Sequence, residues 1–132
     1  MITTDDYFGA KPHSPEQLAA AEALLLKVNT LLTELAWDWL IDPDTGTCIS
    51  GSKGGQGDGG FRLETATTGR PASSHKEARG VDVFDPKGEI DELITDQILE
   101  HHGLYREDPG YTPGWCHLTD RAPGSGKRTF IP

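Results

Sequence analysis

The chain has 132 residues, 12 of them lysine or arginine and 21 aspartate or glutamate, and its formal net charge is −9. This length favours one domain that can bury a hydrophobic core. An acidic chain lacks the basic face that contacts nucleic acid phosphates, and anionic membrane surfaces repel it, so we expect neither as a partner. The 16 glycines and nine prolines indicate that turns and loops make up much of the domain.

The N-terminal residues carry no signal for export or membrane insertion. They are acidic, and no uninterrupted apolar run follows, so we expect no signal peptide, no membrane insertion and a cytoplasmic protein as synthesised. We expect a flexible arm over residues 1–13 and a single domain over 14–132. The two cysteines, Cys48 and Cys116, match neither a disulfide framework nor a metal knuckle, and we expect two free thiols.

The first half of the domain contains one strong helix signal. Ser14, Pro15 and Gln17 match a capping box with proline at the first helical position. Apolar residues at helical spacing follow as far as Trp39, which predicts a long helix with one apolar face. After it the pattern predicts a turn, a short strand, a glycine-rich loop and an extended segment, over residues 42–46, 47–50, 51–60 and 61–63.

The second half alternates short elements with turns. A strand, a type I turn and a second helix are predicted over residues 81–84, 85–88 and 89–102, followed by an extended segment and a tail over 115–118 and 128–132. Gly103 marks the end of the second helix. This order predicts an α+β fold, in which the long N-terminal helix and the second helix pack on a small antiparallel sheet.

Three segments imitate ligand-binding motifs. Residues 55–60 fit a dinucleotide-binding glycine pattern, but no helical pattern follows them. Residues 42–46 lack the glutamate that closes a calcium loop, and Arg128 stands where a P-loop would need serine or threonine after Lys127. We interpret all three as turns or loops.

Two of the five histidines have neighbours that suggest chemistry. His75 precedes the predicted strand, and Asp82 projects from that strand between two valines, so its carboxylate needs a partner such as a metal ion. His117 is a candidate third ligand. Two histidines and one aspartate leave one position of a tetrahedral zinc ion for water, as in catalytic sites. We expect the remaining histidines to be structural or exposed: His13, His101 and His102.

The segment Ser73-x-His75-x-x-Ala78-x-Gly80-x-Asp82 resembles the S-x-H-x-x-G-x-A-x-D signature of the zinc D-Ala-D-Ala peptidases, the M15 class with the Hedgehog/DD-peptidase fold. The two small residues are exchanged relative to that signature. Trp115-Cys116-His117 is similar to the element that bears the family's last zinc ligand. Gly60-Phe61-Arg62 resembles the family's S-G-Y-R element, for which Ser50-Gly51-Ser52-Lys53 is a rival match.

The resemblance covers about residues 45–132, and the C-terminal tail is similar to those of uncharacterised phage and prophage proteins. The resemblance to the M15 peptidases implies that His75, Asp82 and His117 hold zinc, and that zinc-bound water attacks the scissile carbonyl of a peptidoglycan peptide. Arg62, or its rival Lys53, would bind a substrate carboxylate, and Ser73 would support the site by hydrogen bonding. A phage-associated protein that reaches the cell wall is the corresponding expectation for location.

One position departs from the family pattern. Many relatives carry a glutamate general base three residues before the last histidine, where this chain has Gly114. Glu107 and Asp108 are the nearby carboxylates that could replace it. A non-catalytic phage structural or wall-binding protein that retains the fold is therefore a second hypothesis, and an acidic α+β domain of unrelated function is a third.

Overall fold

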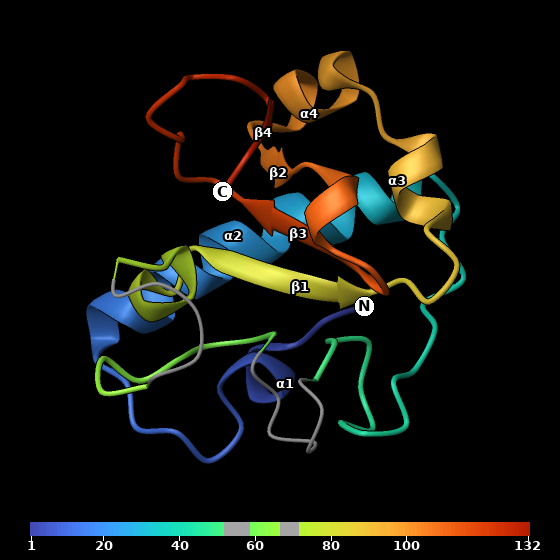
Figure 1. Ribbon diagram of the computed structural model, residues 1–132. Coiled ribbons are helices and arrows are strands. Elements are labelled where there is room, and N and C mark those ends of the chain that lie inside the picture. The colour runs from blue at the N-terminus through green and yellow to red at the C-terminus, as the bar shows by residue number, and fades with distance from the viewer. Residues whose placement is uncertain (52–58, 67–71) are drawn as a thin grey trace.

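A small four-stranded sheet organises the structure, a computed structural model that describes residues 1–51, 59–66 and 72–132 (Figure 1). The strands lie in the order β1-β3-β2-β4, with bounds Gly80–Phe84, Trp115–Thr119, Tyr105–Glu107 and Thr129–Phe130. β3 is antiparallel to both β1 and β2, but β4 runs parallel to β2. The expected α+β class is confirmed, whereas the expected antiparallel sheet is wrong. The connection over 120–128 returns the chain to the starting end of β2, so β4 enters parallel to it.

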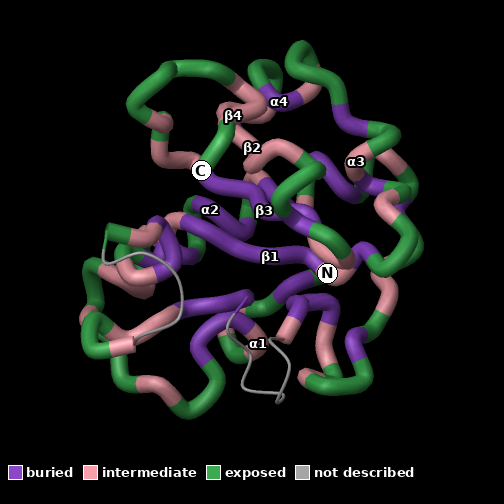
Figure 2. Tube along the Cα trace, viewed as in Figure 1, coloured by how far each residue is buried: buried purple, intermediate pink, exposed green. Residues whose placement is uncertain are grey.

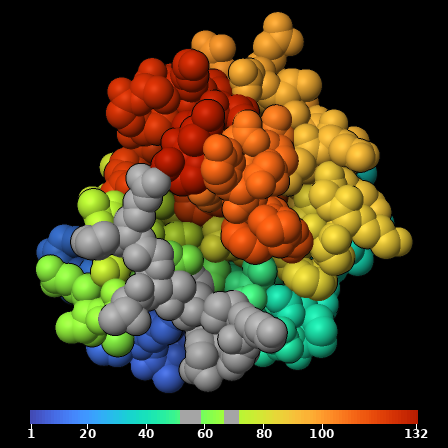
Figure 3. Space-filling view, in the orientation of Figure 1, coloured from blue at the N-terminus to red at the C-terminus, as the bar shows by residue number. Residues whose placement is uncertain are grey.

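The two central strands give the sheet two different faces. Val81, Val83 and Leu118 are buried on one face, and Asp82 and His117 lie on the other, as strand alternation requires. Both strands are buried along most of their length (Figure 2). The polar face is buried because loops and the C-terminal segment cover it. In Figure 3 the C-terminal residues, coloured red, lie on this face beside the orange residues that precede and begin β3.

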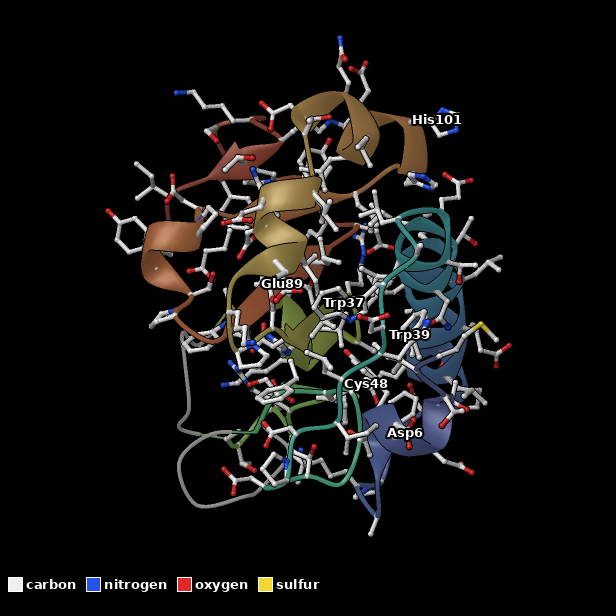
Figure 4. The ribbon with its side chains drawn as sticks, turned by 90° about the vertical axis from the view of Figure 1, so that its right-hand side faces the viewer. Asp6, Trp37, Trp39, Cys48, Glu89 and His101 are labelled. Atoms are coloured by element: carbon white, nitrogen blue, oxygen red, sulfur yellow. The ribbon has the colours of Figure 1, made fainter. Side chains whose placement is uncertain are left out.

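Helix α2 (Pro15–Glu34) lies on the apolar side of the sheet (Figures 1 and 4). Its capping box forms as predicted, because Ser14 Oγ accepts from Gln17 N at 3.1 Å and Ser14 N donates to Gln17 Oε1 at 2.8 Å. The helix ends before the predicted limit at Trp39. Ala36 and Trp39 both adopt a φ of 54°, in the left-handed region, which turns the chain out of the helix.

The N-terminal residues are not the expected flexible arm. They form helix α1 (Thr4–Phe8), whose Tyr7 and Phe8 side chains are buried. Tyr7 Oη donates a hydrogen bond of 2.9 Å to the Gly80 carbonyl oxygen at the start of β1. Five helical residues are too few for a periodic pattern, and this segment is ordered by burial of its two rings.

The second predicted helix is divided into α3 (Glu89–Leu93) and α4 (Asp96–His102). Ile94 is extended, with a ψ of 129°, and Thr95 Oγ1 accepts from Ile98 N at 3.2 Å to start α4. The apolar residues continue across the break, so spacing alone predicted one helix. A threonine side chain that bonds the backbone competes with helix continuation and produces the break.

The remaining predictions have mixed outcomes. The expected strand over 47–50 reduces to isolated bridges, one of which joins Ile49 to Val83. Most of the predicted glycine-rich loop falls on 52–58, outside the described residues. Both cysteines are free and buried, as expected. Among the described residues, none of the helices has the length and hydropathy needed to cross a bilayer.

Candidate metal centre

Three buried side chains from separate elements meet on the polar face of the sheet. His75 lies in the 3-10 turn η1 (Ser74–Glu77), Asp82 on β1 and His117 on β3. Asp82 Oδ1 is 2.7 Å from His117 Nδ1 and 3.3 Å from His75 Nε2. One ligand atom from each of the three residues lies within 4.8 Å of the other two. The three residues predicted to bind metal are therefore brought together.

The sheet register and the η1 turn explain this convergence. Asp82 and His117 are directly opposite each other in the antiparallel β1–β3 pair, so their side chains are neighbours on one face. Ser73 Oγ accepts from His75 N at 3.2 Å and caps η1. Ala78 ends the turn in the left-handed conformation, with a φ of 58°, which directs the chain from His75 back into β1.

The small residues of the signature have distinct roles. A Cβ atom at position 80 would collide with Ser74 Oγ and lie 3.1 Å from His117 Cε1, so close packing behind the centre requires Gly80. Ala78 adopts a backbone conformation that glycine accepts more readily than alanine does. Only glycine fits at position 80, because there is no space for a Cβ atom. Alanine is accommodated at position 78 at some conformational cost.

Backbone and side-chain partners orient the two imidazoles. The Gly60 carbonyl oxygen lies 2.8 Å from His75 Nδ1, which assigns the proton to Nδ1 and leaves the Nε2 lone pair facing Asp82. Ser74 Oγ lies 3.4 Å from His117 Nε2. Such outer partners are typical of metal-binding histidines. Sequence reasoning missed both: Ser74 adjoins His75 in the signature, but the Gly60 carbonyl has no sequence signal.

Electrostatics keep the carboxylate charged and the His75 imidazole neutral. Burial alone would raise the pKa of Asp82, but its interactions with His75 and His117 hold that pKa below its usual range. Burial lowers the pKa of His75 below 6.5, against the opposing effect of Asp82. An ionised carboxylate and a neutral imidazole are the forms that bind metal ions.

The metal-free protein is expected to lose stability as the pH falls below 6.5. His75 takes up a proton near 6.5 when unfolded but only at lower pH when folded, so the unfolded state binds more protons in this range. Asp82 adds a further loss below its ordinary value of 3.8. Urea unfolding with a chelator, at about pH 7.5 and about pH 5.5, measures the difference. His75→Gln should reduce the loss between these two pH values, and an equal loss in that variant would contradict the assignment.

A cavity of about 630 Å³ opens beside the three side chains. Its walls include Arg62, Ser73, Trp115, Arg121 and Phe130. Arg62 Nη2 lies 3.6 Å from Asp82 Oδ2, and the arginine side chain is 11% exposed. Both residues expected to contact substrate, Arg62 and Ser73, thus border the cavity. Lys53, the rival of Arg62, lies outside the described residues.

Only one of the two candidate bases faces this cavity. Tyr105 pairs with Thr119 and Arg106 with Leu118, so the next position along β2, Glu107, continues the register opposite His117. Glu107 lines the cavity. The neighbouring Asp108 accepts from Gly110 N at 2.9 Å and caps the turn that follows β2.

A row of side chains therefore crosses the sheet, one from each strand. Asp82 on β1, His117 on β3, Glu107 on β2 and Phe130 on β4 follow the strand order, and all four line the cavity. The Phe130 ring lies edge-on to the His117 ring, with centroids 6.2 Å apart. The metal-binding group comprises His75, Asp82 and His117 and does not include Glu107. Glu107 is thus placed beside the three potential ligands and outside their set.

No family model, curated protein or solved structure matches the chain. The two histidines, the aspartate and the cavity beside them are thus the observations from which a function is inferred. Their chemistry is that of a buried site with two imidazole nitrogens and one carboxylate, open on one side to a cavity.

Proposed function

We propose that the protein is a zinc-dependent peptidase of the D-Ala-D-Ala carboxypeptidase or endopeptidase type, acting on peptidoglycan peptides. The observation that carries the proposal is the convergence of His75, Asp82 and His117 at the edge of a cavity. The resemblance of residues 73–82 and 115–117 to the M15 peptidase elements supports the choice of reaction. A Hedgehog/DD-peptidase type of fold belongs to the same proposal.

The three residues fit a zinc ion. Two ligands of a tetrahedral zinc, each at about 2.0–2.2 Å, lie about 3.3–3.6 Å apart. The 3.3 Å separation of His75 Nε2 and Asp82 Oδ1 meets this requirement, and the 2.7 Å separation of His117 Nδ1 and Asp82 Oδ1 has to lengthen slightly on binding. Three protein ligands leave one position open, as in catalytic zinc sites.

Zinc bound there would supply activation of water and polarisation of a carbonyl. The chain's own residues supply the rest of the chemistry. The Glu107 carboxylate accepts a proton from the attacking water and delivers it to the amine that leaves, which is the role of a general base and acid. Glu107, opposite His117, would take the role of the glutamate that the family carries at the position of Gly114 in this chain.

Arg62 is suited to bind the carboxylate of a peptide substrate. The planar guanidinium fork matches the geometry of a carboxylate, and Arg62 lines the cavity with its Nη2 3.6 Å from Asp82 Oδ2. Ser73 holds η1, and with it His75, in place through the bond from His75 N to Ser73 Oγ. A short peptide with a terminal or side-chain carboxylate is therefore the proposed class of substrate.

Gly114 supports a second candidate function. If Glu107 does not replace the missing base, the chain is a non-catalytic wall-binding protein or phage structural protein that retains the metal centre. Both candidate functions predict zinc binding, and only the first predicts hydrolysis.

Zinc content and hydrolysis of purified peptidoglycan test the proposal together. Protein purified without chelator should retain one zinc ion per chain, and muropeptides incubated with it should lose D-alanine or be cut within the stem or cross-bridge, as measured by mass spectrometry. Zinc without cleavage selects the wall-binding candidate. Absence of retained zinc, with no rise in thermal stability on adding it, would refute both.

A further inference from the structure

A second group of metal-binding side chains lies where helices α2 and α4 end. Glu34 is the last residue of α2, and His101 and His102 are the last two residues of α4. His102 Nε2 is 2.8 Å from Glu34 Oε2, and the two imidazole rings stand perpendicular with centroids 5.0 Å apart. One ligand atom from each residue lies within 4.8 Å of the other two.

The electrostatics of this place favour a cation. The C-terminal end of a helix carries a partial negative charge, and two such ends meet here. Glu34 adds a full negative charge where a helix prefers a positive one, and the last turn of α2 contains no basic residue. Lys27, further back on α2, lies 3.6 Å from Asp120, and its Nζ is 3.8 Å from a Cβ built on Gly103 at the end of α4. A bound metal ion would add positive charge beside Glu34 at the two helix ends.

The donor set indicates which cation. Two imidazole nitrogens and one carboxylate oxygen suit zinc, cobalt, nickel and copper, whereas calcium and magnesium prefer oxygen ligands only. His102 is well placed to act as the fixed ligand because its side chain is only 8% exposed, while Glu34 at 56% can adjust. Figure 4 shows His101 at the outer end of α4, on the same side of the sheet as α2. The proposed catalytic cavity lies on the opposite face.

We propose that Glu34, His101 and His102 form a second binding site for a divalent transition metal, separate from the buried centre and independent of the proposed peptidase function. Because the ligands come from two helices, the metal ties the end of α2 to the end of α4. Any ligand that binds only the folded state stabilises it. The exposed site should bind more weakly than the buried one and fill only in excess metal.

Cobalt is a suitable probe, since it is paramagnetic and broadens the resonances of nearby amides. The full chain is labelled with ¹⁵N, given one equivalent of zinc and titrated with Co²⁺. We expect broadening to begin at the amides of residues 34–35 and 101–103. His101→Ala should lower the apparent affinity at these amides at least about tenfold, since even the loss of an outer-shell partner costs about 10–100-fold.

The matched control is Glu100→Gln, which removes an exposed carboxylate one residue away from the cluster. It should leave the titration unchanged, whereas Glu34→Gln should weaken it. With EDTA, the thermal midpoints of His101→Ala and Glu100→Gln should equal that of the wild type, because the replaced side chains are exposed. Glu34→Gln also changes the group 2.8 Å from His102 Nε2, so its midpoint with EDTA serves as its own reference. Broadening that is unaffected by His101→Ala, or confined to residues near His75, would overturn the proposal. Neither readout depends on peptide cleavage.

Discussion

Replacing His117 with alanine is expected to abolish both zinc retention and peptide cleavage. The variant loses one of the three proposed ligands and also the donor that lies 2.7 Å from Asp82 Oδ1. Changes to outer-shell partners alone reduce metal affinity about 10–100-fold, so the loss of a ligand should exceed that range. Metal analysis after gel filtration and digestion of muropeptides measure the two effects.

The same substitution leaves a buried carboxylate with fewer partners. Breaking a buried pair typically costs about 3–5 kcal/mol, so unfolding has to be measured alongside metal content. His13→Ala is the control, because His13 is exposed, its Nδ1–H donates to the Lys11 carbonyl oxygen and its ring stacks on Phe8. That variant should keep its zinc and its activity. Zinc retained by folded His117→Ala protein would contradict the assigned ligand set.

Replacing Glu107 with glutamine is expected to lower kcat/KM about 10²–10⁴-fold, the usual contribution of a general base. Zinc content should not change, because Glu107 is outside the metal-binding group. Glutamine preserves the size of the side chain but cannot accept the proton. A loss of rate with unchanged zinc content and unchanged unfolding free energy is a result that a purely structural role for Glu107 would not produce.

Asp108→Asn provides a matched control for this experiment. Asp108 is the adjacent carboxylate, and its side chain accepts from Gly110 N in the following turn. Asparagine keeps a side-chain oxygen that can accept from Gly110 N, so the replacement should change the stability little and leave the rate unchanged. A full rate for Glu107→Gln together with a large loss for Asp108→Asn would reverse the assignment. Inactive wild-type protein with bound zinc would favour the wall-binding candidate.

Local patterns predicted the features that depend on residues close in the chain. The capping box at Ser14 needs only a residue three positions later, and it forms as expected. Asp82 between two valines predicted a buried carboxylate on a strand, because alternation alone places it opposite an apolar face. The pairing of His75 with Asp82 follows from the same segment, since the η1 turn and β1 are adjacent in sequence.

Features that depend on distant segments required the tertiary structure. The burial of Tyr7 under β1 joins residues 73 positions apart, and no local pattern encodes such a contact. The division of the second helix at Thr95 depends on a competition between a side-chain cap and helix continuation, which apolar spacing does not reveal. The parallel entry of β4 depends on where the connection after Thr119 returns to the sheet.

The net charge of −9 is determined by the sequence alone. The three potential metal ligands were predicted from two short motifs, residues 73–82 and 115–117. The choice of Glu107 over Asp108 was decided only by the tertiary structure. The two residues are adjacent in the chain, and their difference arises from the register of β2 against β3. That register is set by backbone hydrogen bonds between strands and by burial of one face. A shift of one residue would exchange the two side chains.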